Sequence, residues 1–492
     1  MIHSYESTLG RLLIAKRGYD GISTGMIKND SRLVLPGDVF VAISGAVADG
    51  HDFIRQALAS GATTIVHTKD LEHYSDRITY LQVTDATRAY SRLLRTHFGK
   101  PDLQVPLFGV TGTNGKTTSA FIIAHLFQHA QVPCGLFSTV EYRDGKTITQ
   151  ATHTTPDAGQ FFPRLRTMRK NGLKTAVMEV SSHALAQGRI AGAKFHTAIF
   201  TNLTGDHLDY HGSMEEYYQA KRRLFSELFS PDGTAIINVD DPFGMRLAEE
   251  LGSRTMHSFG QSPAAEWVIS NVELSSSGTR FVISNEDTVF PVETNLIGAH
   301  NVYNLTGAIL AVRNYGLSWE AISHALSQEI TVPGRLQKFS SATGADFYVD
   351  YAHSDDALKN VLAILRRICR NKLTVVFGAG GDRDRTKRPR MGKVAAELAD
   401  NIILTSDNPR TEDPMQIIQE IAAGIPAEKP VFIEADRRKA MAAAVNNASA
   451  GDVILIAGKG HENYQIIGTE RTHLDDREVI ADLLKKQANQ SL

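Results

Sequence analysis

The sequence predicts an α/β protein of three domains. Short apolar runs rich in β-branched residues alternate with longer helical stretches along most of the chain. Segments with Pro and Gly interrupt this pattern near residues 99–106 and 332–335. A length of 492 residues also exceeds what one hydrophobic core supports. We therefore expect a small N-terminal α/β domain (1–103), a central domain with a mostly parallel sheet (104–332) and a C-terminal doubly wound, Rossmann-like domain (333–492).

The predicted elements follow in chain order. In the first domain we expect strands at 38–43 and 63–67 and a helix at 51–60; in the second, strands at 105–110, 175–180, 197–200 and 233–238, a helix at 119–130 and a hairpin-like, more antiparallel segment at 265–292; in the third, strands at 347–351, 373–377, 401–404 and 452–456. Strands that alternate with helices in this way favour parallel sheets covered by helices.

Composition excludes several classes of protein. The net charge of −2 gives no general attraction to nucleic acid or to an anionic membrane. Two cysteines far apart in sequence imply buried free thiols and no disulfide framework. No apolar run is long enough to cross a bilayer, and the first residues do not read as a secretion signal. We expect a cytoplasmic enzyme.

The most informative segment is residues 112–118, Gly-Thr-Asn-Gly-Lys-Thr-Thr, between an apolar run and a helical stretch. Its glycines, Gly112 and Gly115, let backbone N–H groups approach phosphate oxygens at a helix N-terminus. Lys116 can reach the outer phosphates, and Thr117 can bind Mg²⁺. The strict phosphate-loop pattern needs a glycine at position 110, which is Val here. We predict that the central domain is a phosphate-loop ATPase domain; a glycine-rich loop without a ligand is the alternative.

Polar residues follow two further strands of this domain. Glu179 ends an apolar run, where an acid commonly faces a bound metal; its alternative role is to cap the next helix. Residues 201–211 hold two acids and two histidines, which suit a magnesium or substrate site better than zinc, because no cysteine joins them. A loop with capping acids is the alternative. Lys221 lies on a predicted helix, and spacing alone indicates a solvated lysine.

Six motifs in order resemble the Mur ligase superfamily, the ATP-dependent amide-forming enzymes of peptidoglycan precursor synthesis. They begin at Gly112, Glu179, Thr201, Gly298, Pro333 and Asp350, and the match covers almost the whole chain. Residues 30–32, Asp-Ser-Arg, and 407–410, Asp-Asn-Pro-Arg, indicate the branch that adds diaminopimelate. The resemblance implies that the D-glutamate of UDP-N-acetylmuramoyl-L-alanyl-D-glutamate is joined to meso-diaminopimelate by a monomer that uses ATP and Mg²⁺.

The resemblance also implies roles for individual residues. Lys221 would be carbamylated (N6-carboxylysine), which replaces an ammonium that repels Mg²⁺ by an oxygen anion that binds it. The metal positions are Thr117, Glu179, His207 and Lys221; the ATP positions are Gly112, Thr113, Asn114, Gly115, Lys116, Thr117, Thr118, Asn301, Asn304, Arg335 and Asp350; the UDP-muramoyl dipeptide positions are Ser31, Ala46, Val47, Ala48, Thr154, Thr155, Ser181, Gln187 and Arg189; the diaminopimelate positions are Arg383, Asp407, Asn408, Pro409, Arg410, Gly458 and Glu462.

The residues at 407–410 themselves favour a diamino dicarboxylic acid. Arg410 offers a planar fork that grips a carboxylate, and Asp407 and Asn408 can hold an ammonium nearby. Lysine has no distal carboxylate, so it would leave a buried Arg unpaired at a cost of about 1–3 kcal/mol. In the family, lysine-adding relatives replace this Arg. Taken alone, Asn-Pro also favours an ordinary turn.

We expect acyl transfer through an acyl phosphate, with catalysis by Lys116, Lys221 and either His207 or His353 as the group that accepts the amine proton. Rival functions within the fold are addition of L-lysine, another step of the same pathway, or folylpolyglutamate synthesis. A rival of another class is a nucleotide-dependent binding protein that makes no amide.

Overall fold

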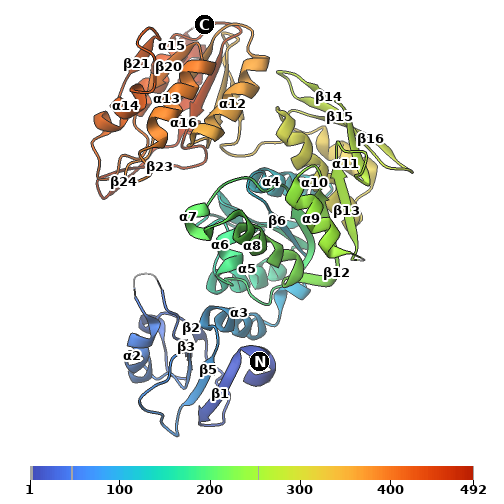
Figure 1. The fold of residues 1–492 in the computed structure, drawn as a ribbon, viewed down its shortest axis with the longest axis vertical. Coiled ribbons are helices and arrows are strands. Elements are labelled where there is room, and N and C mark those ends of the chain that lie inside the picture. Colours follow the sequence, from blue (N-terminus) through green and yellow to red (C-terminus); the bar gives the residue numbers. More distant parts are fainter. Residues whose placement is uncertain (1–3, 46–47, 253, 491–492) are drawn as a thin grey trace. The chain divides into compact units, whose positions relative to one another are not determined.

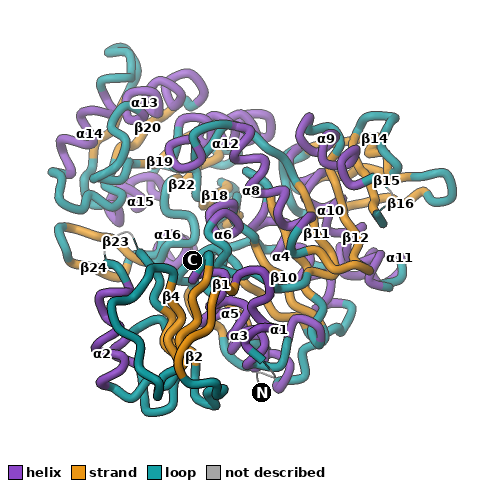
Figure 2. Tube along the Cα trace, turned by 60° about the horizontal axis from the view of Figure 1, so that its bottom comes forward, coloured by secondary structure: helices purple, strands orange, loops and turns teal. Residues whose placement is uncertain are grey.

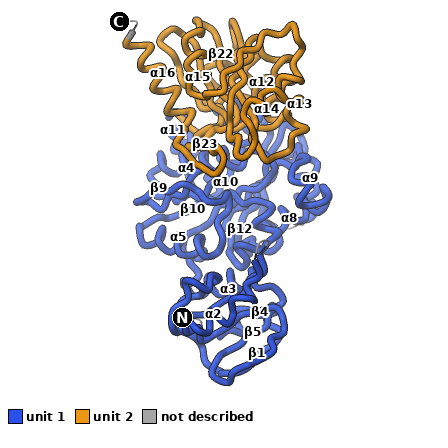
Figure 3. Tube along the Cα trace, turned by 90° about the vertical axis from the view of Figure 1, so that its left-hand side faces the viewer, with its two compact units in different colours: residues 1–271, 281–292, 300–328 blue, residues 272–280, 293–299, 329–492 orange. Residues whose placement is uncertain are grey.

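The computed structural model describes residues 4–45, 48–252 and 254–490. The chain divides into two compact units (Figure 3). One comprises Met1–Asn271, Phe281–Val292 and His300–Gln328, and the other comprises Val272–Arg280, Glu293–Ala299 and Glu329–Leu492. The boundaries that we expect at 103/104 and 332/333 stay predictions.

The N-terminal part of the first unit forms a five-stranded sheet in the order β1-β5-β4-β3-β2 (Figure 1). β1 pairs antiparallel with β5, and the other neighbours are parallel. The elements are α1 (Tyr5–Leu9), β1 (Leu13–Gly18), β2 (Ile27–Lys28), β3 (Val39–Val41), α2 (Ile54–Ala59), β4 (Thr64–His67), β5 (Thr79–Val83) and α3 (Ala86–His97). The helix expected at 51–60 begins as a 3₁₀ turn, Gly50–Phe53, because Asp49 caps it by accepting from the His51 N–H.

An eleven-stranded sheet follows, in the order β16-β15-β14-β13-β12-β11-β6-β10-β7-β8-β9. Its strands are β6 (Leu107–Thr111), β7 (Cys134–Phe137), β8 (Glu141–Arg143), β9 (Ile148–Gln150), β10 (Thr175–Glu179), β11 (Phe195–Phe200), β12 (Phe229–Asn238), β13 (Met256–Gly260), β14 (Trp267–Leu274), β15 (Thr279–Ser284) and β16 (Val289–Thr294). Pairings from β7 through β10, β6, β11, β12 and β13 to β14 are all parallel, whereas β7-β8 and β8-β9 are antiparallel. β6 and β10 are buried throughout, as apolar central strands of a parallel sheet are.

The helices that accompany this sheet are α4 (Lys116–His129), α5 (Ala158–Lys170), α6 (Ser182–Ala186), α7 (Leu208–His211), α8 (Met214–Ser226), α9 (Pro242–Leu251), α10 (Ala299–Tyr315) and α11 (Trp319–Leu326). Side-chain oxygens start several of them: Asp157 caps α5 and Ser213 caps α8 by accepting a backbone N–H three residues on. Cys134 and Cys369 are free, but each is half-buried, not fully buried as expected.

The second unit holds a six-stranded sheet in the order β17-β18-β22-β19-β20-β21. Only β17-β18 is antiparallel. The elements are β17 (Gln337–Ser340), β18 (Asp346–Asp350), α12 (Asp355–Ile368), β19 (Leu373–Phe377), α13 (Lys387–Leu398), β20 (Asn401–Leu404), α14 (Pro414–Ala422), β21 (Val431–Ile433), α15 (Arg437–Asn446), β22 (Val453–Ala457), the hairpin β23 (Tyr464–Ile467) and β24 (Glu470–His473), and α16 (Asp476–Gln490).

Two separate apolar clusters cover the strands of this sheet. Leu358 of α12, Met391 of α13 and Ile418 of α14 belong to one cluster, and Met441 of α15 and Ile480 of α16 belong to the other. Figure 2 shows these helices flanking the strands. Helices on both faces of a mostly parallel sheet confirm the doubly wound architecture. No helix among the described residues is long and apolar enough to span a membrane.

Candidate active site

The loop between β6 and α4 has the geometry of a phosphate-binding turn. Gly112 and Gly115 adopt φ angles of +150° and +86°. A Cβ atom would lie 1.9 Å from the Thr201 hydroxyl at the first position and 2.2 Å from the Asn304 side-chain oxygen at the second, so both positions require glycine. The loop leads into the N-terminus of the 14-residue helix α4, which favours an anion.

A residue just after the end of the neighbouring strand β11 holds this loop. The Thr113 N–H donates to the Asn202 carbonyl (2.9 Å), and the Asn114 N–H donates to the Asn202 side-chain oxygen (2.9 Å). Asn202 lies in the polar segment that we singled out but was not itself predicted. Lys116 Nζ donates to the carbonyls of Gly112 (2.9 Å) and Thr113 (2.8 Å). Thr118 follows in the first turn of α4 and is buried.

Asn301 and Asn304 lie on α10 beside this loop. The Asn304 amide donates to the Asn301 side-chain oxygen (3.0 Å), and Ser119 donates to the Asn304 oxygen (3.4 Å). The structure therefore brings these two predicted nucleotide contacts next to the phosphate loop.

Glu179 is fully buried at the end of β10, next to Val110 of β6. Its carboxylate accepts from the Thr117 hydroxyl (2.8 Å) and from the Thr139 N–H (2.7 Å). Ser181, not Glu179, caps α6, by accepting from the Ala184 N–H. The capping alternative is thus wrong, and a buried carboxylate beside a hydroxyl is a donor set that suits a hard cation.

Lys221 lies on α8 with only 1% of its surface exposed. Its Nζ donates to the Gly112 carbonyl (2.7 Å) and lies 4.5 Å from the centre of the Tyr217 ring. Burial, together with the nearby positive charge of Lys116, lowers the pKa of the Lys221 amine well below its usual value. The interpretation as a solvated helix lysine is therefore wrong. Its surroundings favour the neutral amine, which is the nucleophilic form.

His207 is more open. Its side chain is 48% exposed, and its ring centre lies 4.8 Å from that of His183 and 6.3 Å from that of Tyr217. The described part of the chain contains no group of three His, Cys, Asp or Glu side chains that could hold a metal ion. A metal ion bound by Glu179 and His207 would therefore need further oxygen ligands from Thr117 and from a carbamylated Lys221.

Hydrogen bonds join the predicted dipeptide contacts to the end of β10. Thr155 Oγ1 donates to the Glu179 carbonyl (2.7 Å) and accepts from the Ser181 N–H (2.9 Å), while Thr154 Oγ1 accepts from Thr139 (3.1 Å). Gln187 accepts from Arg189 Nε (2.7 Å) and lies largely exposed. Thr139 is a contact that sequence reasoning missed, since nothing local distinguishes this threonine.

In the N-terminal part of the unit, Ser31 is buried and donates to the Gln56 side-chain oxygen (2.9 Å). Ala48 is exposed, and its carbonyl accepts from the Gly45 N–H. Ala46 and Val47 lie outside the described residues.

The second unit holds the remaining predicted nucleotide contacts. Asp350 is buried at the end of β18 and accepts from the Leu336 N–H (2.7 Å) and the Ala352 N–H (2.8 Å). Burial raises the pKa of its carboxyl. The Arg335 guanidinium lies 5.0 Å from the centre of the Tyr351 ring. His353 is exposed, and its Nδ1 donates to the Tyr351 carbonyl (2.9 Å), which leaves Nε2 as an acceptor.

The loop Asp407–Arg410 follows β20 and joins three segments. Asn408 donates from Nδ2 to Glu462 (2.9 Å), and Arg410 donates from Nη1 to the Gly381 carbonyl (2.7 Å). At Gly458, a Cβ atom would lie 2.5 Å from the Asp407 carboxylate, so this glycine permits the close approach. Pro409 is buried, whereas Arg383 is exposed and donates to the Asp382 carbonyl (3.1 Å).

Two buried arginines that were not predicted hold segments next to this loop. Arg388 is fully buried and donates to Glu412 (2.8 Å) and to the Gly380 carbonyl (3.3 Å). Arg437 forms a fully buried pair with Asp476, 2.7 Å apart, and donates to the Ala457 carbonyl (2.9 Å). Both lie in helices where sequence alone indicates solvated cations.

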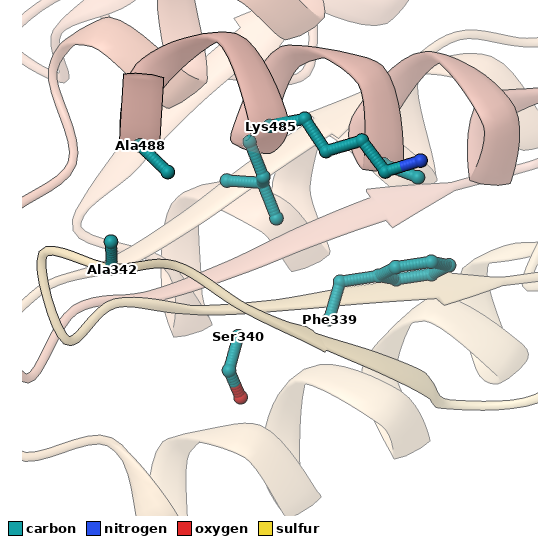
Figure 4. A pocket seen from close by; sticks show the side chains of 7 residues that line it. Phe339, Ser340, Ala342, Lys485 and Ala488 are labelled. Atoms are coloured by element: carbon teal, nitrogen blue, oxygen red, sulfur yellow. The ribbon is translucent and has the colours of Figure 1, made fainter. Parts of the chain in front are cut away.

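A shallow groove of about 370 Å³ lies between β17 and α16 in the same unit (Figure 4). Phe339, Leu484 and Lys485 are among its lining residues, and no predicted site residue is.

Comparison with known proteins agrees with these features. Family models match three successive segments: the Mur ligase family catalytic domain at residues 24–97, the Mur ligase middle domain at 110–312 and the Mur ligase glutamate ligase domain at 334–460. A protein of Gloeobacter violaceus named UDP-N-acetylmuramoyl-L-alanyl-D-glutamate–2,6-diaminopimelate ligase is 42% identical, covering 96% of this chain and 98% of its own.

A protein of the same name from Parasynechococcus marenigrum is 43% identical over 94% of both chains. The solved structure of a ligase with this name superposes with a TM-score of 0.72 at 33% identity, covering 99% of this chain and all of its own. Three matching domains and identities above 40% over nearly the full length show that the chain belongs to the Mur ligase family.

Proposed function

We propose that this chain is an ATP-dependent ligase that adds meso-diaminopimelate to the D-glutamate of UDP-N-acetylmuramoyl-L-alanyl-D-glutamate, a step of peptidoglycan precursor synthesis. The names of its relatives support this function. One observation in the chain itself carries it: Arg410 donates to the Gly381 carbonyl, the Gly381 N–H donates to the Asn408 carbonyl, and the Asn408 amide donates to Glu462. An Arg beside two acids and an amide suits an amino acid whose distal end has both a carboxylate and an ammonium.

ATP would bind at the phosphate loop. The N-terminus of α4 supplies positive potential for the phosphates. Asn301 and Asn304 beside the loop, and Arg335 and Asp350 in the second unit, are the proposed further nucleotide contacts.

Mg²⁺ fits the residues present at the end of β10. Glu179 is buried and accepts from the Thr117 hydroxyl, so its carboxylate offers oxygen ligands of the kind that Mg²⁺ prefers. Thr117, Glu179, His207 and carbamylated Lys221 would hold the ion, which supplies charge neutralisation for the phosphoryl group. The lowered pKa of Lys221 supports the carbamate, because only the neutral amine reacts with carbon dioxide.

The reaction follows from the chemistry of carboxylates. The D-glutamyl carboxylate oxygen attacks the γ-phosphorus of ATP, and ADP leaves, which converts a poor leaving group into phosphate. The amine of diaminopimelate then attacks the acyl carbon, and the tetrahedral intermediate collapses to the amide and inorganic phosphate. Lys116 offsets negative charge on the transferred phosphoryl group. The proton of the amine goes to His353, whose Nε2 is an acceptor, or to His207.

The other substrate would be held by the residues around Thr155. Thr154, Thr155, Ser181, Gln187 and Arg189 are the proposed contacts of the muramoyl dipeptide, and Ser31 and Ala48 are proposed for the uridine diphosphate. We expect the enzyme to act as a monomer in the cytoplasm, where ATP is available.

Phosphate release from ATP tests this function. The full chain is given ATP and Mg²⁺, with and without the UDP-linked dipeptide, and with meso-diaminopimelate or L-lysine. Release that needs the dipeptide and diaminopimelate together, with formation of the UDP-linked tripeptide, is the expected result. Phosphate release that needs the dipeptide and L-lysine, and does not occur with diaminopimelate, would indicate the lysine-adding branch. Release that needs neither the dipeptide nor an amino acid would indicate a nucleotide-dependent binding protein.

A further inference from the structure

A buried lysine without an assigned role lies among the proposed diaminopimelate contacts. Lys459 follows Gly458 and has no exposed surface. Its Nζ donates to the Asn408 side-chain oxygen (3.2 Å) and lies 3.6 Å from a carboxylate oxygen of Glu462. The ring centre of Tyr464 is 5.4 Å away. Lys459 therefore touches two of the proposed ligand-binding side chains from the protein side.

The charges around Lys459 form a small set. Asp407 is 8% exposed, and the side chain of Glu462 is 19% exposed. Burial lowers the pKa of Lys459, and the attraction of Asp407 and Glu462 offsets only part of that shift. Arg437 is also nearby, but Asp476 neutralises it in a pair with both side chains fully buried. We add Arg410, which follows Asp407 and Asn408 in the same loop and lies within electrostatic range of Tyr464.

The set contains as many acidic as basic side chains. Asp407 and Glu462 are the acids, and Lys459 and Arg410 are the basic groups. A ligand end that carries one ammonium and one carboxylate leaves this balance unchanged. A ligand end that carries only an ammonium adds an uncompensated positive charge to a site with little solvent, where charges interact more strongly than in water.

We propose that Lys459 is a positioning and specificity-determining residue, which sets the charge of this site so that amino acids with a zwitterionic distal end are preferred over those with a distal ammonium alone. This inference rests on the proposed function. Lys459 acts through Asn408 and Glu462 and through its charge, whereas Arg410 acts by direct hydrogen bonds to the ligand.

Lys459→Met tests this role, because it removes the charge and keeps an unbranched side chain of similar length. The kcat/KM values for meso-diaminopimelate and L-lysine are measured side by side in the full-length enzyme, with saturating ATP and UDP-linked dipeptide. The kcat/KM for diaminopimelate divided by that for L-lysine should fall at least about tenfold, because the variant site has one positive charge fewer. Lys485→Met is the matched control: it removes an exposed lysine from α16 of the same unit and should leave the ratio unchanged.

Glu462→Gln changes the charge in the opposite direction and decides the question even if Lys459→Met does not fold. It leaves one net positive charge, so the preference for diaminopimelate over lysine should rise. The double variant Lys459→Met/Glu462→Gln restores the balance and should return the ratio toward that of the wild type.

Equal losses with both amino acids in Lys459→Met, or a ratio that does not move in opposite directions in the two single variants, would overturn the inference and leave Lys459 as a packing residue. A wild-type chain that joins neither amino acid to the dipeptide would instead overturn the proposed function, and this inference with it.

Discussion

Lys221→Met separates the proposed chemical role of Lys221 from any structural one. The amine is buried and donates a hydrogen bond of 2.7 Å to the Gly112 carbonyl. A typical hydrogen bond contributes about 1 kcal/mol to stability. The Gly112 carbonyl also accepts from Lys116 at 2.9 Å, so it keeps a donor in the variant. Met fills a similar volume and carries no polar group to desolvate. We therefore expect the free energy of unfolding to change by no more than about 1 kcal/mol.

Turnover should respond very differently. If carbamylated Lys221 helps to hold the ion that neutralises the phosphoryl group, its loss removes an electrostatic contribution to the transition state. Removal of one such group typically lowers kcat by about a hundred- to a thousandfold. Dipeptide-dependent and diaminopimelate-dependent phosphate release measures kcat, and denaturant unfolding measures stability on the same preparation.

Two controls make the result specific. Arg222→Met changes the neighbouring cation of α8, whose side chain is 37% exposed, and should leave kcat nearly unchanged. Removal of carbon dioxide from the buffer should slow the wild type, and added bicarbonate should restore it, with no effect on Lys221→Met. Near-normal turnover of Lys221→Met would refute the carbamate. A loss of activity that merely follows a large loss of stability would refute the chemical role.

Three further outcomes are expected. Arg410→Ala should lower kcat/KM for diaminopimelate about a hundredfold, since two charge-assisted hydrogen bonds are worth about 3 kcal/mol, and should leave the KM for ATP unchanged; equal losses for both substrates would contradict the specificity argument. Gly112→Ala places a Cβ atom 1.9 Å from Thr201 Oγ1 at a φ of +150°, so nucleotide affinity measured by calorimetry should fall at least about tenfold; unchanged affinity would show that the loop adapts. Hydrogen bonding to Arg388 lowers the pKa of Glu412 from 4.5 to about 2. Its ionised form therefore stabilises the fold above pH 4.5, and this contribution is lost as the pH falls toward 2. In Glu412→Gln, the free energy of unfolding in urea should fall less steeply over that range; the same slope in both proteins would contradict the pairing.

Much of the fold was predictable because the relevant signals are local. Apolar runs of the right length became the strands β19 and β20 at the expected residues, and β10 and β11 within two residues of them. The glycines of residues 112–118 predicted a tight turn before a helix, and the structure has positive φ at Gly112 and Gly115. A helix boundary differs from the predicted one where a side chain caps the backbone, as Asp49 does by accepting from the His51 N–H in the turn before α2.

The candidate site was predictable only where the residues lie in a recognisable run, such as 112–118 or 407–410. Spacing indicated a solvated Lys221, yet the tertiary structure buries it against the Gly112 carbonyl, 109 positions away in sequence. Glu179 could equally have capped the next helix until the fold placed it against Thr117.

Sequence alone therefore determined which segments form strands, helices and the phosphate loop, because backbone preference and apolar periodicity act over a few neighbouring residues. Only the tertiary structure decided which charged side chains lose their water and which partners they meet. Lys221, Arg388, Arg437 and Lys459 all have basic side chains that a helix or loop pattern alone would leave in solvent. Their burial depends on elements distant in the chain packing over them, and that packing sets both their charge partners and their chemistry.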